Sequence, residues 1–318
     1  MRVISIGTPC QLWLLMSLTA IRLLCNTSGS GKTRLLFEGL CQYWGFYIVA
    51  ERADDDIGAR DLEYMIASMG QSRGWTDKIL NHSDEEARIR NENIALNRIS
   101  KVLLARWVVF DTFIKVVKEL NGGEVPDGAR REWLLFQILP TIQVKDMDPF
   151  LAFISLCLNY VHYTDLRALL DQFTPSTVLG PAFRQPAFLH VLDEAQVAGE
   201  KYVGAFVDQA GKAPRPVLRP IILGLTSQSK FSTKMVVSGT GFSLSLFEKL
   251  VTSQVLKGES KWGNVVYMTG DFSDRNTQSA YISRYLPGSF LDSESGALLM
   301  TCMHEWLRGR CVALIQPR

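Results

Sequence analysis

The amino-acid sequence predicts an α/β fold with a parallel sheet. A glycine-rich loop follows a short apolar run at 19–25 and precedes a helical pattern at 34–45, and further short apolar runs recur along the chain. Apolar runs of this length, bounded by turn residues, are typical of strands that a parallel sheet buries on both faces. We therefore expect strands at 19–25, 46–50, 187–193, 234–238 and 264–268.

The first strand belongs to an apolar stretch, 3–25, which is similar to the core of a secretory signal. Three residues leave no uninterrupted membrane span in it: Pro9, Gln11 and Arg22. Cleavage near residue 20 would remove the strand that leads into the loop. We therefore interpret 19–25 as a buried strand and expect an intracellular protein, cytoplasmic or nuclear. Residues 1–18 stay unassigned, and secretion as an effector stays open.

The loop at 26–33 reads Asn-Thr-Ser-Gly-Ser-Gly-Lys-Thr, which is the phosphate-loop pattern G-x-x-x-x-G-K-S/T with Asn26 in place of the first glycine. In such a loop Gly31 permits close backbone approach, Lys32 neutralises the β- and γ-phosphate oxygens, and Thr33 binds Mg²⁺. Asn26 tolerates a left-handed backbone, so we expect weakened rather than lost binding. The residues expected at the nucleotide are Asn26, Thr27, Ser28, Gly29, Ser30, Gly31, Lys32, Thr33 and Arg34.

Helical patterns fill the segment 51–185, which is longer than one crossover connection needs. A long helix is expected from Asp84 to the Asn-Gly-Gly sequence at 121–123, and two more at 130–139 and 149–173. The prolines at 175, 181 and 186 are interpreted as the return to the sheet. The aromatic residues of this segment could form a surface for a protein partner, but core packing is the favoured interpretation.

The strand at 187–193 ends in two carboxylates. Asp193 is placed to hold Mg²⁺, and Glu194 is the candidate catalytic base that polarises the attacking water. The alternative is a surface pair that caps a helix. His190, inside the apolar run, is interpreted as a core residue.

The strand at 234–238 also ends in polar residues. Ser238 and Thr240 could bind the γ-phosphate or the attacking water, because ligands bind beyond the carboxyl ends of parallel strands. The glycines at 239 and 241 could equally serve a tight turn into a helix at 243–255.

The composition allows one large globular unit. Of 318 residues, 47% are hydrophobic and 21% are charged, which argues against disorder. The 34 basic residues balance 32 acidic ones to a net charge of +2, so the total gives no strong indication of nucleic acid or a membrane as partner. The six cysteines form no Cys-x-x-Cys pair, which makes a structural zinc site unexpected.

These motifs resemble the ASCE branch of P-loop ATPases, which includes the AAA+ and STAND families. The Walker A motif corresponds to 26–33, and Walker B to Asp193 and Glu194. The phrases TSGSGKTRLLFEGLCQYWGFYIVA, LDEAQ, SGTGFSL and WLRGR look like those of fungal Crinkler-type, effector-like ATPase-domain proteins. The resemblance implies a P-loop NTPase three-layer sandwich with a parallel sheet and a large helical insertion, with ATP and Mg²⁺ as cofactors. The expected units are a core at 19–50 and 186–290, an insertion at 51–185 and a truncated helical lid at 291–318.

The resemblance also implies an arginine that reaches the γ-phosphate from a lid or a neighbouring subunit. Arg308 and Arg310 are the preferred candidates for this finger, and Ser238 and Thr240 are the candidates for the sensor positions. Arg215, Arg219 and Arg284 are further candidates for the finger. For each arginine the alternative is a solvated surface charge.

The leading hypothesis is Mg²⁺-dependent ATP binding and hydrolysis that drives a conformational switch. Lys32, Glu194 and Thr240 are its expected catalytic residues. Two alternatives stay open: a P-loop small-molecule kinase, and a nucleotide-binding interaction module that does not hydrolyse. The guanine-binding N-K-x-D motif is absent from the sequence, so ATP is the default nucleotide. The oligomeric state has no sequence signal.

Overall fold

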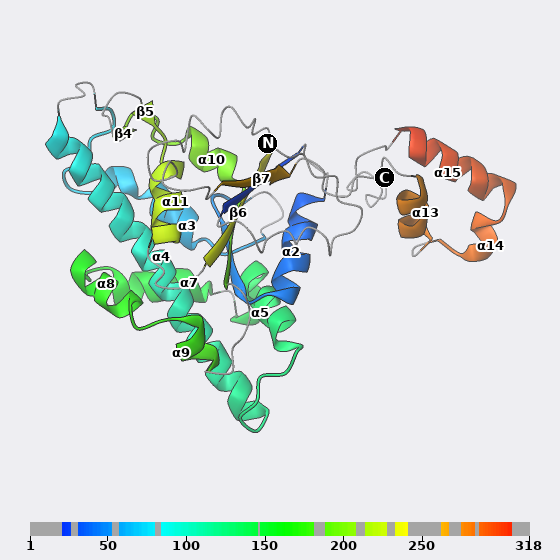
Figure 1. Ribbon diagram of the computed structural model, residues 1–318, viewed down its shortest axis with the longest axis horizontal. Coiled ribbons are helices and arrows are strands. Elements are labelled where there is room, and N and C mark those ends of the chain that lie inside the picture. The colour runs from blue at the N-terminus through cyan, green and yellow to red at the C-terminus, as the bar shows by residue number, and fades with distance from the viewer. Residues whose placement is uncertain are drawn as a thin grey trace.

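The computed structural model contains a five-stranded sheet whose neighbouring strands are all parallel (Figure 1). The strands are β1 (Ile21–Asn26), β2 (Gly45–Val49), β3 (Phe188–Asp193), β6 (Thr233–Thr240) and β7 (Trp262–Val266), in the order β2-β3-β6-β1-β7. This confirms the α/β class, and each expected strand is present within a few residues. The structure describes residues 21–26, 31–52, 57–79, 84–145, 147–180, 188–207, 214–227, 233–240, 262–266, 275–283 and 286–306.

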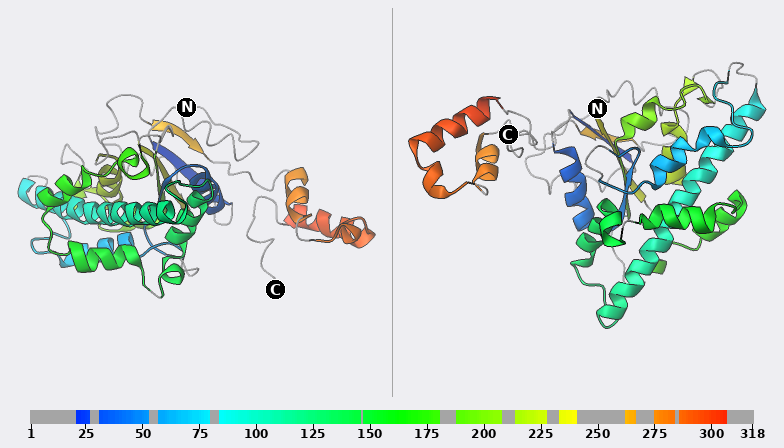
Figure 2. Two further views of the ribbon diagram at one scale, coloured as in Figure 1. Left: turned by 90° about the horizontal axis from the view of Figure 1, so that it is seen from below. Right: turned by 180° about the vertical axis from the view of Figure 1, so that it is seen from behind.

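Helices cover both faces of the sheet, which is compatible with a three-layer α/β fold (Figures 1 and 2). On one face α2 (Lys32–Gln42) and α5 (Ala129–Ile138) contribute Leu36 and Leu134 to a cluster with Val191 of β3. On the other face lie α3 (Asp61–Ala67), α4 (Glu85–Leu120) and α11 (Leu218–Ser227). Helices from the segment 51–185 therefore pack on both faces of the sheet.

Helix α4 confirms the long helix expected after Asp84. It has 36 residues, and the Asp84 side chain caps it by accepting a hydrogen bond from the backbone of Ala87 at 2.9 Å. Its length is about 54 Å at 1.5 Å per residue. The rings of Trp107 and Phe110 pack against Phe46 and Phe188 of the sheet, so these aromatic residues serve the core as expected. No helix in the described ranges combines the length and apolarity needed to cross a membrane.

The outer edge of β2 is covered by side chains from the helices. The backbone carbonyl of Gly45 accepts from the Trp133 indole at 2.8 Å, and the Gln137 side chain accepts from the backbone N–H of Tyr47 at 2.9 Å. Gly45 lies so close to β3 that an added Cβ would be 2.1 Å from the Leu189 carbonyl oxygen, which excludes a side chain there. These contacts satisfy backbone groups that an edge strand otherwise leaves open.

The helix expected at 149–173 is interrupted. Helix α7 (Pro149–Phe153) passes into a π-helical turn, η2 (Ile154–Leu158), and a turn precedes α8 (Tyr163–Leu170). Pro175 does not mark a return to the sheet but begins α9 (Pro175–Leu179), because Thr174 forms a capping box and proline suits the first helical position.

The remaining elements are short or lie near the C-terminus. They are η1 (Met69–Gln71), α6 (Pro140–Gln143), α10 (Ala195–Glu200), the antiparallel pair β4 (Phe206–Val207) and β5 (Pro214–Arg215), α13 (Arg275–Ile282), α14 (Gly288–Leu291) and α15 (Glu294–Trp306). Helices α13 and α15 contact each other where the Gln278 amide donates to the Met303 carbonyl at 3.0 Å. The helix expected at 243–255 lies outside the described residues.

Candidate functional site

The candidate site lies at the carboxyl ends of three adjacent strands. Strand β6 lies between β1 and β3, and Thr240 at its end pairs in register with Asn26 at the end of β1. Side chains alternate along a strand, so Asp193 and Ser238 face the side on which Val191 and Val236 pack with α2. The sheet thereby brings residues that are far apart in the sequence together at one edge.

Helix α2 begins at this edge, directly after the glycine-rich loop. Gly31 has a left-handed backbone, with φ of 85°, and Lys32, the first helical residue, is buried. A positive φ suits glycine, which has no Cβ to clash. The expected order of strand, loop and helix is present, while residues 27–30 of the loop lie outside the described residues.

Thr33 and Asp193 are in direct contact although 160 positions separate them. The Thr33 hydroxyl donates to Asp193 Oδ2 at 3.2 Å. The same oxygen accepts from the Tyr47 hydroxyl at 3.0 Å, and Asp193 Oδ1 accepts from the backbone N–H of Glu194 at 3.0 Å. With three donors around it and 2% of its surface exposed, the carboxylate is held in one orientation.

Tyr47 is a site residue that the sequence did not indicate. An aromatic residue in an apolar run is expected in the core, and the Tyr47 ring does pack there, 5.1 Å from the Phe37 ring. Its backbone is fixed as well, because the Arg106 guanidinium donates to the Tyr47 carbonyl at 2.7 Å. Arg106 is itself bound by both carboxylate oxygens of Asp61, at 2.7 and 2.8 Å, and both side chains are fully buried.

Gln196 connects the tips of β3 and β6. Its amide N–H group donates to the Glu194 carboxylate, and its amide oxygen accepts from the backbone N–H of Thr240 at 3.1 Å. Glu194 has a left-handed backbone with φ of 51°, which is uncommon for a residue with a Cβ. The only sequence signal for Gln196 was its place two residues after the carboxylate pair.

Ser238 is buried, and its hydroxyl has no hydrogen-bond partner among the described residues. An unpartnered buried hydroxyl is destabilising by about 1–3 kcal/mol, so such groups call for a structural or functional explanation. Its position two residues before the end of β6 supports a polar role at this edge.

Thr33 and Asp193 offer oxygen ligands, which Mg²⁺ prefers. In the described part of the chain, no group of three or more His, Cys, Asp or Glu residues could hold a metal. A magnesium site of the kind found with phosphates uses one or two carboxylates and completes its shell with phosphate oxygens and water. The donor set therefore fits Mg²⁺ bound together with a phosphate ligand.

Other predicted site residues lie elsewhere. Arg34 is on the surface of α2 and donates to Glu38 at 2.9 Å. Arg219 is neither a solvated charge nor a candidate for the finger, because it is buried and forms an ion pair with Glu92 of α4. The structure places Arg215 in β5. The side chain of Asn26, and Arg284, Arg308 and Arg310, lie outside the described residues.

His190 is a core residue, as expected. Its Nδ1 is 3.1 Å from the Leu225 carbonyl oxygen, and its ring stacks on Phe46 with centroids 5.6 Å apart. Burial lowers the pKa of His190 to about 4. The side chain is therefore neutral at physiological pH.

Comparisons with protein-family models, with curated proteins and with solved structures found no match to this chain.

Proposed function

We propose that the chain binds ATP with Mg²⁺ and hydrolyses it, as an ASCE-type P-loop ATPase of the AAA+/STAND kind that acts as a conformational switch. The observation that carries the proposal is the 3.2 Å hydrogen bond between Thr33 and Asp193. It joins the residue after the loop lysine to the carboxylate at the end of β3. Each motif was recognised in the sequence without reference to the other. Neither motif by itself requires that Thr33 and Asp193 be in contact.

Each residue at this edge has a role in the proposal. Gly31 and the following N-terminus of α2 offer backbone N–H groups to phosphate oxygens, and Lys32 neutralises their charge. Thr33 and Asp193 would hold Mg²⁺, which when bound neutralises charge on the β- and γ-phosphate oxygens. Ser238 and Thr240 offer hydroxyl groups to the γ-phosphate or to the attacking water.

Glu194 is the proposed base, and Gln196 is its positioning residue. Glu194 must accept a proton from water, so its carboxylate has to leave Gln196 or share that hydrogen bond. Because Gln196 also binds the Thr240 backbone, movement at the tip of β6 would change the position of Glu194. Through this contact, a change in the backbone near the γ-phosphate would alter the position of the base.

The same contact favours one alternative, a nucleotide-binding module that does not hydrolyse. If the Gln196 amide stays hydrogen-bonded to the Glu194 carboxylate when ATP is bound, that carboxylate is not free to act as the base. Gln196→Ala distinguishes the two functions, because release of phosphate should rise in a module that Gln196 blocks and fall in an enzyme that needs Gln196 for alignment.

The direct test measures Mg·ATP affinity by calorimetry and phosphate release for the wild type and three variants. Lys32→Ala should lose binding, whereas Glu194→Gln should bind and not turn over. Glu200→Gln is the matched control, because Glu200 is an exposed carboxylate at the end of α10, and it should behave as wild type. Wild-type binding without turnover would contradict hydrolysis, and phosphate transfer to an added acceptor would favour the kinase.

A protein partner at the helical segment and an intracellular location stay predictions. Exposed apolar side chains on this segment, Leu156 and Tyr160, support the former, with 82% and 93% of their surface accessible.

A further inference from the structure

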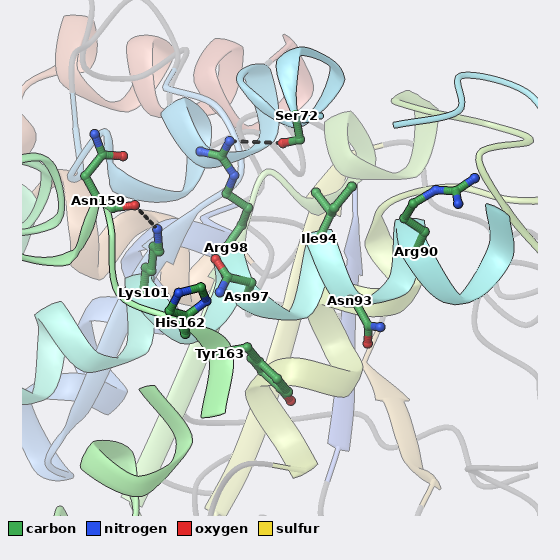
Figure 3. A pocket seen from close by; sticks show the side chains of 10 residues that line it. All are labelled: Ser72, Arg90, Asn93, Ile94, Asn97, Arg98, Lys101, Asn159, His162 and Tyr163. Atoms are coloured by element: carbon green, nitrogen blue, oxygen red, sulfur yellow. Dashed lines mark hydrogen bonds between the residues drawn. The ribbon is translucent and has the colours of Figure 1, made fainter. Parts of the chain in front are cut away.

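A polar cavity of about 400 Å³ lies beside α4, away from the strand tips (Figure 3). Helix α4 contributes one wall, and the residues directly after η1 and η2 and the start of α8 contribute the others. The lining residues are Ser72, Arg90, Asn93, Ile94, Asn97, Arg98, Lys101, Asn159, His162 and Tyr163. The volume is within the range of sites for small molecules.

The cavity is on the face of α4 that is turned away from the sheet. The lining positions 90, 94, 97, 98 and 101 recur every three or four residues, which places them on one side of the helix. The core positions Ala95, Ile99, Arg106 and Phe110 fall on the opposite side. The cavity is therefore separate from the site proposed for the nucleotide.

Among the described residues, three cations and no carboxylate line this cavity. Lys101 donates to the Asn159 carbonyl at 2.8 Å, Arg98 to the Ser72 hydroxyl at 3.0 Å, and Arg90 to the Gly74 carbonyl at 2.9 Å. Figure 3 shows the first two of these contacts. All these acceptors are neutral, and no ion pair joins the three cations to a carboxylate of the described residues.

The positive charge is concentrated at the base of the cavity. Lys101 has only 6% of its surface exposed. Burial lowers the pKa of Lys101, and the nearby charge of Arg98 lowers it further. Burial likewise lowers the pKa of Arg98. A bound anion would relieve the repulsion between the two cations and replace solvent that burial has removed from them.

We propose that this cavity binds a small phosphorylated molecule. Its phosphate would lie against Lys101 and Arg98. The Lys101 ammonium retains two N–H groups beyond the one bound to Asn159, and Arg98 retains its Nε–H, because its terminal nitrogens donate to Ser68, Ser72 and Met65. The side-chain amides of Asn93 and Asn97 can each donate and accept hydrogen bonds, which suits a polyhydroxylated remainder of the ligand. Arg90 adds a third cation at the rim.

The test measures binding to protein that carries Lys32→Ala, so that the glycine-rich loop does not contribute. Ribose 5-phosphate, inorganic phosphate and ribose are titrated without Mg²⁺ by calorimetry. We expect one saturable site for ribose 5-phosphate, weaker binding of phosphate and none of ribose. Adding Lys101→Met should weaken the binding of ribose 5-phosphate about tenfold or more, because the substitution removes a hydrogen-bonded charge while it keeps the apolar stem of the side chain.

Two further variants keep the test decisive. Arg90→Gln changes an exposed residue and should weaken binding even if Lys101→Met does not fold. Lys115→Met is the control, because Lys115 lies on the same helix with its side chain 73% exposed, outside the cavity, and affinity should not change. The proposal fails if ribose 5-phosphate does not bind, if ribose binds equally well, or if Lys101→Met and Arg90→Gln have no effect. It also fails if an oligonucleotide competes with an affinity that grows with its length, since that outcome indicates an extended nucleic-acid surface.

Discussion

The buried histidine of β3 makes the stability of the fold depend on pH. His190 lies between Phe46 and the Leu225 carbonyl, and burial is the main cause that lowers its pKa from 6.5 to about 4. The charge of Arg106 lowers the pKa further, and the hydrogen bond to Leu225 opposes the shift. In the unfolded chain the same side chain regains its ordinary pKa.

The sign follows from the protons that each state binds. Between pH 6.5 and 4 the unfolded chain takes up a proton that the folded protein does not, so acidification favours unfolding. The full shift corresponds to roughly 3 kcal/mol. From pH 7.5 to pH 5 we expect His190 to remove about 2 kcal/mol from the free energy of unfolding.

Urea unfolding at pH 7.5 and 5 measures this contribution. His190→Asn can still present an amide N–H group to Leu225 but does not titrate. Carboxylates also titrate in this range, so the measured quantity is the difference between proteins. Wild type and His162→Asn, an exposed control, should each lose about 2 kcal/mol more than His190→Asn on acidification. Equal losses in all three proteins would refute the reasoning.

Two other predictions concern polar groups buried in the core. Arg106→Met should lower the free energy of unfolding by about 3–5 kcal/mol in urea, because it leaves Asp61 buried without its cation. Asp61→Leu in addition should restore much of that loss, and a double variant as unstable as the single one would contradict this account. Ser238→Ala should leave stability unchanged or raise it by up to about 1 kcal/mol, since the hydroxyl has no partner among the described residues, while phosphate release falls. Unchanged phosphate release would remove Ser238 from the proposed site.

The parts of the fold that the sequence predicted are those with a local pattern. Strands β2 and β3 are buried at every position, so each consists mostly of apolar residues, with His190 and Asp193 as the exceptions in β3. Helix α4 has a cap at one end and glycines at the other, and these residues act within one turn of the helix. The loop before α2 has a pattern that depends on eight consecutive residues. Such signals can be recognised without knowledge of the rest of the chain.

The parts that the sequence did not predict depend on contacts between distant residues. The break at η2 is a shift of the helical hydrogen bonds, and an apolar periodicity of three to four residues does not distinguish it from a regular helix. Trp133 and Gln137 looked like ordinary residues of a helix, but they complete the edge of β2. Tyr47 and Gln196 acquire their roles only because the strand order brings them to the tips of β3 and β6.

The contact between Thr33 and Asp193 leads to the most direct test of the proposed function. A double-mutant cycle with Thr33→Val and Asp193→Asn measures the affinity for Mg·ATP and, as a control, for ATP without metal. If the two residues hold one metal ion together, each single variant should weaken the binding of Mg·ATP by tenfold or more, or about 1.4 kcal/mol. The double variant should then bind Mg·ATP only slightly less tightly than the single variant with the lower affinity. Metal-free ATP should bind all four proteins similarly. Additive losses, or Mg·ATP affinity that none of the variants alters, would contradict the account.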